Sequence, residues 1–391
     1  REEYQMFQGD DQSWMPGPWA EIGQLIDPVT GVEYASPPNG SNGLAGTPPR
    51  AAGRFRRDNV SVYGDLEWDI SDTWLLQFAL RFEDFDDFGT TTNAKVATRV
   101  NLTDRFTVRG AVSTGFRAPS PGQSNLETIV TTFDTDSGLQ VNEGTLKPTD
   151  PLVAPLGGKA LDAEDAVNFS LGFTTDLTDN LTVTLDYYFI EVTDRIAKTF
   201  NIDVSNDPNF QAAGFSSVAF YTNALDTETQ GIDLVASWGI EYGGGSSGTI
   251  NFAYNWNDTE VTGQNLVNGA QPVGDGIVFN IENNLPDNRM FLSYNHHWDS
   301  VMVTARVNWY DEASDERGFP LVETVDSAAT VDLEARWSPN DTFTWTLGAN
   351  NIFNEFPNEV QSRQSNGLAY SRRTPFGYDG GMWYFRGTVN F

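Results

Sequence analysis

The most constraining feature of this sequence is a strict alternation of apolar and polar residues. In the C-terminal stretch GMWYFRGTVNF (residues 381–391), one set of alternate positions holds Trp383, Phe385, Val389 and Phe391. The residues between them are mainly polar or charged. Side chains of a β-strand point alternately to its two faces. The pattern therefore predicts a strand with one face suited to hydrocarbon and the other to water, ending on the aromatic Phe391.

The same alternation predicts about 14 strands and no helix. The expected strands lie at 1–8, 59–70, 74–86, 92–102, 105–116, 163–176, 180–189, 227–240, 249–261, 286–297, 300–310, 326–337, 342–350 and 381–391. No apolar run approaches the roughly 18 residues of a transmembrane helix, and the mean hydropathy is −0.39. Neither fact argues against a membrane barrel, because only every second residue of its strands meets lipid.

Two kinds of connection alternate between the expected strands. Short polar turns lie at 71–73, 103–104, 178–180, 299–300 and 339–341, with a looser one at 243–248. Long stretches rich in Gly, Pro and Asn lie at 9–57, 117–162, 193–226, 262–285, 313–325 and 354–380. Short periplasmic turns opposite long extracellular loops are typical of an outer-membrane barrel. The sequence thus predicts an all-β, transmembrane antiparallel β-barrel rather than a soluble sandwich, whose outward face would be polar.

Composition narrows the function. The chain has 54 acidic and 23 basic residues and a net charge of −31, so its surface repels nucleic acid. It has no cysteine, which excludes disulfides and thiolate metal sites. Acidic stretches at 83–87 and 9–11 either bind calcium through their oxygens or form solvated loops. Neither has the spacing of an EF-hand, so we expect solvated loops there, with no metal and no cofactor. The start REEYQMF has neither an initiator Met nor a signal peptide, so we expect a piece of a longer, processed protein.

The histidines argue against an enzyme. His296 and His297 are the only two in the chain, and adjacent residues of a strand lie on opposite faces. A hydrolase needs a base, an orienting acid and a nucleophile that converge at one place. This pair, beside a short turn, does not supply that arrangement.

Several motifs resemble one family. The stretch STGFRAPSPGQ places Gly115, Phe116, Arg117, Ala118 and Pro119 where a strand opens into a long loop. Residues 226–238 contain Gly231, and residues 347–357 contain Asn350, Asn351 and Phe353. Together with 161–173 and the C-terminal strand ending at Phe391, these stretches resemble the C-terminal barrel portion of TonB-dependent outer-membrane receptors. The resemblance covers essentially the whole chain.

The resemblance implies the architecture and the partners. Receptors of this family have a 22-strand barrel around a globular plug, so residues 1–391 would supply the C-terminal strands. The plug, the TonB-contacting segment and the N-terminal strands would lie outside this chain. Implied partners are that N-terminal barrel portion, the plug, the TonB–ExbB–ExbD motor acting through the plug, and the lipid and lipopolysaccharide of a Gram-negative outer membrane.

The implied function is active import of a scarce nutrient, either a ferric siderophore or an oligosaccharide. A passive porin-like channel is the alternative. Haem is disfavoured, because the haem receptors of this family carry a loop histidine after FRAP and residues 120–162 contain none. Candidate ligand contacts are Trp14, Trp19, Arg117, Tyr221 and Tyr310. Such aromatic residues either stack on a ligand or pack the loops together, and Arg117 either contacts a ligand or pairs with an acid of the lumen.

Overall fold

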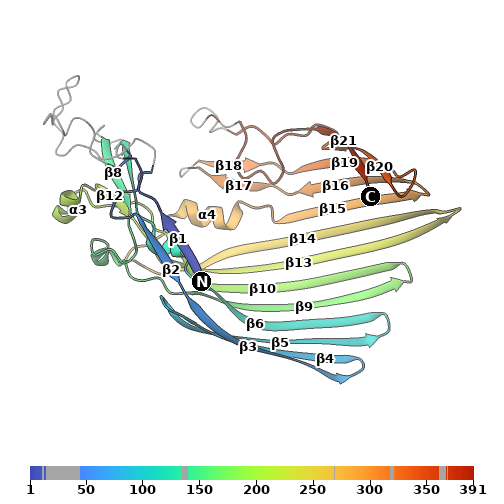
Figure 1. Cartoon of the computed structure of the whole chain (residues 1–391), viewed down its shortest axis with the longest axis horizontal. Coiled ribbons are helices and arrows are strands. Elements are labelled where there is room, and N and C mark those ends of the chain that lie inside the picture. The colour runs from blue at the N-terminus through green and yellow to red at the C-terminus, as the bar shows by residue number, and fades with distance from the viewer. Residues whose placement is uncertain are drawn as a thin grey trace.

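The largest unit of the structure is one curved antiparallel sheet (Figure 1). The computed structural model describes residues 1–10, 13–14, 45–133, 140–267, 269–317, 321–360, 367 and 369–391. The sheet has 13 strands. In chain order they are β3 (Asn59–Ser71), β4 (Trp74–Phe85), β5 (Gly89–Thr103), β6 (Phe106–Arg117), β9 (Glu164–Thr178), β10 (Leu181–Lys198), β13 (Tyr221–Gly243), β14 (Ser246–Gln264), β15 (Asn288–Trp298), β16 (Val301–Tyr310), β19 (Ala328–Trp337), β20 (Phe343–Asn350) and β21 (Met382–Val389). Each pairs with the neighbours that adjoin it in this order.

The connections confirm the predicted two-sided layout. The turns 71–74, 103–106, 178–181, 243–246, 298–301 and 337–343 all lie at one end of the sheet, and the long segments lie at the other. β3 and β21 are the two edges, and within the described part of the chain the sheet does not close on itself. In chain order and in hairpin pairing, the sheet is therefore a section of an up-and-down barrel wall.

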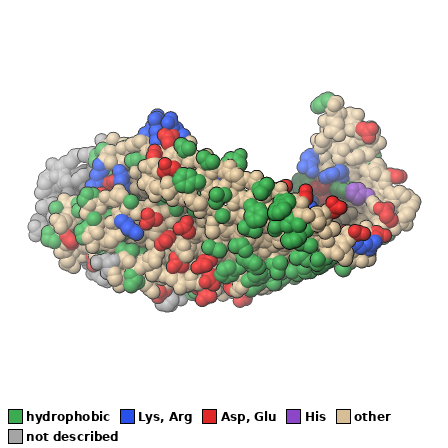
Figure 2. Space-filling model, turned by 90° about the horizontal axis from the view of Figure 1, so that it is seen from below, with side chains coloured by type: hydrophobic (Ala, Val, Ile, Leu, Met, Phe, Trp, Pro, Cys, Tyr) green, Lys and Arg blue, Asp and Glu red, His purple; other side chains and the backbone are tan. Residues whose placement is uncertain are grey.

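The two faces of the sheet differ in chemistry as the alternation predicts. On one face, the apolar face, large apolar side chains pair across neighbouring strands, as in the row Phe252, Leu292 and Val307. Many of these side chains are exposed, including Trp383 (66%) and Phe385 (68%). Figure 2 shows hydrophobic side chains gathered in a band right of centre, with acidic side chains on both sides of it. Such exposure of large apolar groups fits a face covered by lipid.

The N-terminal strand differs from the expectation. Residues 1–8 contain the short strand β1 (Glu2–Met6), which is not one of the 13 strands. It pairs with β2 (Gly53–Arg57), and β2 runs into β3 after one residue. The alternation predicted the strand but not its partner, because β2 lies within a stretch expected to be a loop.

The long connections hold ordered structure that was not predicted. β7 (Thr128–Phe133), β8 (Gln140–Thr145), β11 (Ile202–Asp203) and β12 (Ser217–Ala219) form a four-stranded sheet. Short helices α2 (Pro121–Asn125), α3 (Pro208–Ala213), α4 (Asp275–Asn283) and the 3₁₀ turn η2 (Ala154–Leu156) correct the expectation of no helix. β17 (Ala313–Glu316) and β18 (Val322–Val325) form a separate hairpin.

A buried apolar cluster explains why these loops are ordered. It joins Leu146 and Val153 of one long segment to Phe210, Phe215 and Phe220 of another. Neither segment could bury this surface alone, so the two loops stabilise each other. Within the described residues, no helix has the length and apolar character needed to cross a membrane.

Candidate functional site

A row of polar residues crosses the polar face of the sheet. The backbone register places Asp186 of β10 opposite Asp233 of β13, then Asn255, Arg289 and finally Tyr310 of β16. The two carboxylates face each other directly, which is unfavourable without compensation. Arg109 of β6 donates to Asp186 over 2.9 Å from its Nε atom, and Asn255 donates to Asp233 over 2.8 Å. These contacts satisfy both acids at the surface of the sheet.

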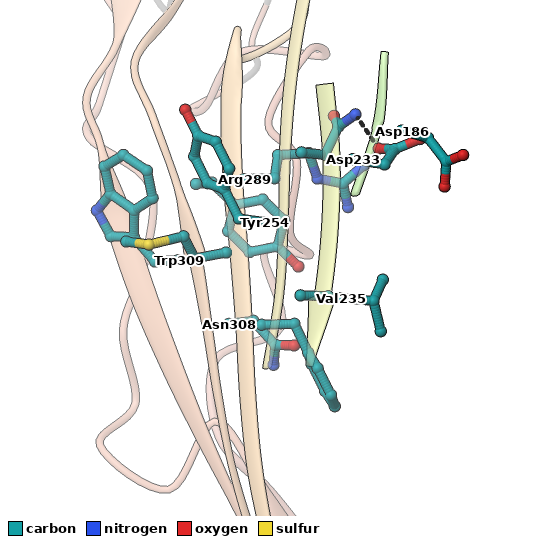
Figure 3. A pocket seen from close by; sticks show the side chains of 12 residues that line it. Asp186, Asp233, Val235, Tyr254, Arg289, Asn308 and Trp309 are labelled. Carbon is teal, nitrogen blue, oxygen red and sulfur yellow. Dashed lines mark hydrogen bonds between the residues drawn. The ribbon is translucent and has the colours of Figure 1, made fainter. Parts of the chain in front are cut away.

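A cavity of about 570 Å³ lies along this row. Its lining includes Asp186, Asp233, Arg289, Asn308 and Tyr310 (Figure 3). In Figure 3, Asp186 and Asp233 lie on one side of the strands and Trp309 on the other, as the alternation requires. The Arg289 guanidinium lies over the Tyr310 ring at 5.2 Å. The cavity wall thus offers donors, acceptors and an aromatic face, a combination suited to holding a polar solute or another part of the protein.

Gly231 makes room for an inward-facing aromatic ring. A Cβ atom at this position would lie 2.3 Å from the Tyr188 ring and 2.6 Å from the backbone oxygen of Trp256. The hydroxyl of Tyr188 in turn accepts a hydrogen bond from Asn257 over 2.8 Å. The glycine of this motif therefore has a packing reason, since an aromatic side chain covers it from the neighbouring strand.

The GFRAP stretch joins the end of β6 to the loops. Arg117 forms an ion pair with Glu164 of β9, and Glu164 also accepts the backbone N–H of Ile196 over 2.8 Å. Glu164 is buried, and its carboxylate raises the pKa of the Arg117 guanidinium through hydrogen bonding. A Cβ atom added at Gly115 would have one neighbour within 4 Å among the described residues, the side-chain nitrogen of Asn168 at 3.8 Å. The charge of Arg117 is thus engaged within the protein.

Arg57 holds the rest of this stretch in place. It is 2% exposed and donates to both oxygens of Asp87 and, over 2.5 Å, to the carbonyl of Pro119. Its guanidinium also lies 5.1 Å from the centre of the Phe88 ring. Phe116 contacts Phe85 edge-on at 5.7 Å. A buried arginine with a bidentate carboxylate is a strong, directional contact, and sequence reasoning missed it because Arg57 lies in an expected loop.

The motif Asn350–Phe353 forms the exit from β20. Asn351 adopts a left-handed conformation (φ 50°) and donates its backbone N–H to Asp332 over 2.9 Å. Its side chain bonds the backbone of Glu355 in both directions. Asn350 pairs with Met382 of β21, and Phe353 is exposed. Of the GFRAP residues, Ala118 directly follows the end of β6. Asparagine is favoured here because it tolerates positive φ and caps the turn.

The predicted ligand contacts are spread over the molecule. Tyr310 lines the cavity, whereas Trp14 donates its indole N–H to the Gly9 carbonyl over 3.2 Å. Tyr221 lies at the outer end of β13 and pairs with Lys198. Trp19 lies outside the described residues. Their contact with a ligand stays a prediction, and Phe391 lies exposed just beyond β21.

The acidic stretch 83–87 is not the solvated loop that was expected, because its first three residues end strand β4 and Glu83 is buried. Glu83 pairs with Arg81 and Asp87 with Arg57. Across the described ranges, no group of three or more His, Asp or Glu side chains is placed to hold a metal ion. His296 lies on the apolar face opposite Val303, with its ring against Trp298 at 3.8 Å. His297 points the other way, as expected.

The geometry defines the class of protein. An antiparallel wall with one apolar and one polar face, short turns at one end and tall loops at the other is a section of a transmembrane β-barrel. The family model described as "TonB dependent receptor-like, beta-barrel" matches residues 3–352. The chain therefore belongs to the TonB-dependent receptors, which are outer-membrane proteins of Gram-negative bacteria and transporters rather than enzymes.

Relatives and solved structures agree with this family. The chain is 28% identical to the ferric enterobactin receptor PirA of Pseudomonas aeruginosa over 137 residues, covering 34% of this chain and 17% of that protein. It is 38% identical to the vitamin B12 transporter BtuB of Photobacterium profundum over 64 residues, covering 16% and 10%.

Among solved structures, a variant of the ferric enterobactin receptor PfeA of Pseudomonas aeruginosa matches with a TM-score of 0.65 at 15% identity. That match covers 100% of this chain and 49% of the receptor. The siderophore receptor PirA of Acinetobacter baumannii matches with a TM-score of 0.60 at 15% identity, covering 87% and 46%. The chain thus spans about half the length of these receptors, and at this identity the match establishes the fold.

Proposed function

We propose that this chain forms part of an active importer of a ferric siderophore. The observation that carries the proposal is the match of the entire chain to about half of a ferric enterobactin receptor. A sequence relative is also described as a ferric enterobactin receptor. The protein would bind the chelate from outside and release it inward without making or breaking a covalent bond.

The wall chemistry supports an occupied lumen. The polar face carries Arg109, Asp186 and Asp233 in compensated contacts, together with the cavity beside Arg289 and Tyr310. Such a polar wall suits a plug that must move during transport, because solvated ion pairs between wall and plug are weak and can be broken at little cost. The partners we propose are that plug and the TonB–ExbB–ExbD motor that would act through it.

The two edges of the sheet supply a further expectation. β3 and β21 each have one sheet neighbour among the described residues, and an open edge leaves backbone groups unsatisfied in lipid. We propose that the N-terminal barrel portion pairs with both edges in the outer membrane. Lipid and lipopolysaccharide would cover the apolar face.

Two alternatives to a siderophore importer, an oligosaccharide importer and a passive channel, have less support. An oligosaccharide is less well supported than a chelate, because the relatives reported above are siderophore receptors and a vitamin B12 transporter. A passive porin-like channel would need no energy source and would conduct small solutes generally. Membership in the TonB-dependent family favours active import over that alternative.

Mass spectrometry of small molecules that co-purify with the receptor from native outer membrane tests the cargo. An iron-bearing chelate is the expected result. A ladder of hexose-spaced masses, or a corrinoid, would overturn the siderophore assignment while leaving import in place. Passive conductance in planar bilayers, without any bound cargo, would favour the channel instead.

A further inference from the structure

Three arginines converge on one buried carboxylate in the extracellular loops. Asp315 of β17 is fully buried, and Arg317, Arg372 and Arg373 lie 3.7, 3.5 and 4.0 Å from its oxygens. Two of these arginines come from the long segment between β20 and β21, so the cluster joins two loops. In a chain with 54 acidic and 23 basic residues, such a concentration of positive charge needs an explanation.

The contacts with Asp315 leave donors free. Distances of 3.5–4.0 Å exceed those of good charge-assisted hydrogen bonds. Among the described residues, the Oδ1 atom of Asp315 has no hydrogen-bond partner, and Oδ2 accepts only a long bond of 3.4 Å from the hydroxyl of Ser371. Asp315 therefore holds the arginines together without saturating their five N–H donors each.

The free donors face solvent. The side chains of Arg372 and Arg373 are 50% and 42% exposed, whereas Asp315 is 0% exposed. Across the described ranges, neither arginine has another carboxylate within ion-pair distance. Glu323, the cross-strand neighbour of Asp315, is also buried. The surface of the cluster therefore presents two guanidinium groups with the donor geometry that suits an oxyanion.

Aromatic rings lie in the same segment as the arginines. Tyr370 stacks between Phe356 and Tyr378, with centroid separations of 6.1 Å on both sides. Both ends of this stack are exposed, and Tyr378 (49%) is more exposed than Phe356 (38%). Phe376 stacks on Tyr310 at 5.9 Å, and Tyr310 lines the cavity on the polar face. The segment 369–378 thus connects an exposed surface of rings and positive charge to the wall of the lumen.

We propose that Arg372, Arg373 and Tyr378 form a capture site for an anionic, aromatic iron chelate of the catecholate type. The inference rests on the proposed function and narrows its substrate class. The guanidinium groups would take the anionic oxygens, and the exposed Tyr378 ring would stack on an aryl ring of the chelate. Asp315 is a positioning residue, because it gathers the arginines from behind and is too buried to meet the ligand.

Binding to the receptor in native outer membranes tests the site. The probes are the iron(III) complex of 2,3-dihydroxybenzoic acid, which is anionic and aromatic, and a neutral ferric trihydroxamate. The double variant Arg372→Gln/Arg373→Gln should weaken binding of the anionic complex by about tenfold or more, as expected for charged hydrogen bonds. Added salt should weaken binding to the unmodified receptor more than to the variant.

Two further variants separate recognition from loop order. Tyr378→Leu leaves the Asp315 contacts intact and should weaken binding of the aromatic complex by about fivefold. Arg105→Gln makes the same charge change at a short turn, where Arg105 pairs with Asp179, and should leave binding unchanged.

The outcomes distinguish the capture site from the importer. Equal affinity of the receptor and both loop variants for the anionic complex would overturn the site and leave ferric-chelate import standing. So would binding of the neutral trihydroxamate alone. Loss of lipopolysaccharide binding in the double variant, with chelate affinity unchanged, would reassign the arginines to lipid phosphate. A receptor that binds no iron chelate at all would overturn the proposed function.

Discussion

Two adjacent residues of β15 test which face of the sheet meets lipid. Leu292 lies near the middle of the strand on the apolar face, between Phe252 and Val307, and is 45% exposed. Ser293 lies on the polar face opposite Arg306 and accepts a hydrogen bond from Asn251 over 3.4 Å. Leu292→Asp and Ser293→Asp add the same charge one residue apart.

The expected losses of folding free energy differ by about 2 kcal/mol, roughly thirtyfold in the folded fraction. An acidic side chain at the midplane of a bilayer costs roughly 2 kcal/mol. Losing the lipid-facing half of a leucine costs about 1 kcal/mol more. Leu292→Asp should therefore lose about 3 kcal/mol, a hundredfold change in the folded fraction. Ser293 is buried, but Ser293→Asp places its charge opposite Arg306, which offsets most of the desolvation cost, so it should lose about 1 kcal/mol.

The assay is urea titration of the assembled receptor in lipid vesicles, followed by the gel mobility of folded and unfolded barrels. The level of each variant in the outer membrane provides an independent reading. Equal losses in the two variants, or a greater loss for Ser293→Asp, would refute the assignment of the apolar face to lipid.

Three further changes probe the loops and the wall. Glu164→Gln should lower the free energy of unfolding by about 1–2 kcal/mol, because it removes the charged partner of Arg117, and should speed proteolysis of the 117–162 loop. The control is Asp179→Asn, in the exposed pair with Arg105, which should change stability by less than about 0.5 kcal/mol. Gly231→Ala should lower stability by about 1–3 kcal/mol in a urea titration, since its Cβ would lie 2.6 Å from a backbone oxygen. The control is Gly239→Ala, whose Cβ would lie 3.9 Å from its nearest neighbouring atom. Equal losses in the two variants would show that close packing at Gly231 is not the cause. The pKa of Asp287, at the loop end of β15, is raised. The main cause is partial burial, and repulsion from the neighbouring carboxylates of Asp258 and Asp311 adds to it. Its folded pKa exceeds its unfolded one, so stability should fall as the pH rises through the raised pKa; Asp287→Asn should abolish that fall, and an unchanged pH profile would contradict it.

The sequence was most informative where side chains meet lipid. Alternation such as that of Trp383 and Phe385 is imposed by the two solvents on either side of the wall, so it predicted the strands, their faces and the side on which each loop lies. It underestimated β13, which has 23 residues, because outside the membrane the apolar positions give way to polar ones. Helix α4 and the β17–β18 hairpin were missed for a related reason: short elements packed on other loops carry no long periodic signal.

The candidate site depended on information that a single sequence does not contain. The row from Asp186 through Asp233 to Tyr310 exists because five strands share one register. A one-residue shift of any of these strands would move its member of the row to the apolar face. Arg57 and Asp315 could not be recognised as organising residues, since most of their partners lie tens of residues away in the chain. In contrast, Gly231 and Asn351 were singled out from motifs, and the structure supplies their reasons in packing and backbone conformation.

Uptake of radioactive iron tests the central claim most directly. Cells that carry the receptor and cells that lack it are supplied with an iron(III) catecholate complex, with and without a protonophore that collapses the energy source of the inner membrane. If the receptor is an active importer, iron should accumulate only in cells that have both the receptor and an energised membrane. Accumulation that persists at the same rate after the protonophore, or that is equal in cells without the receptor, would contradict it.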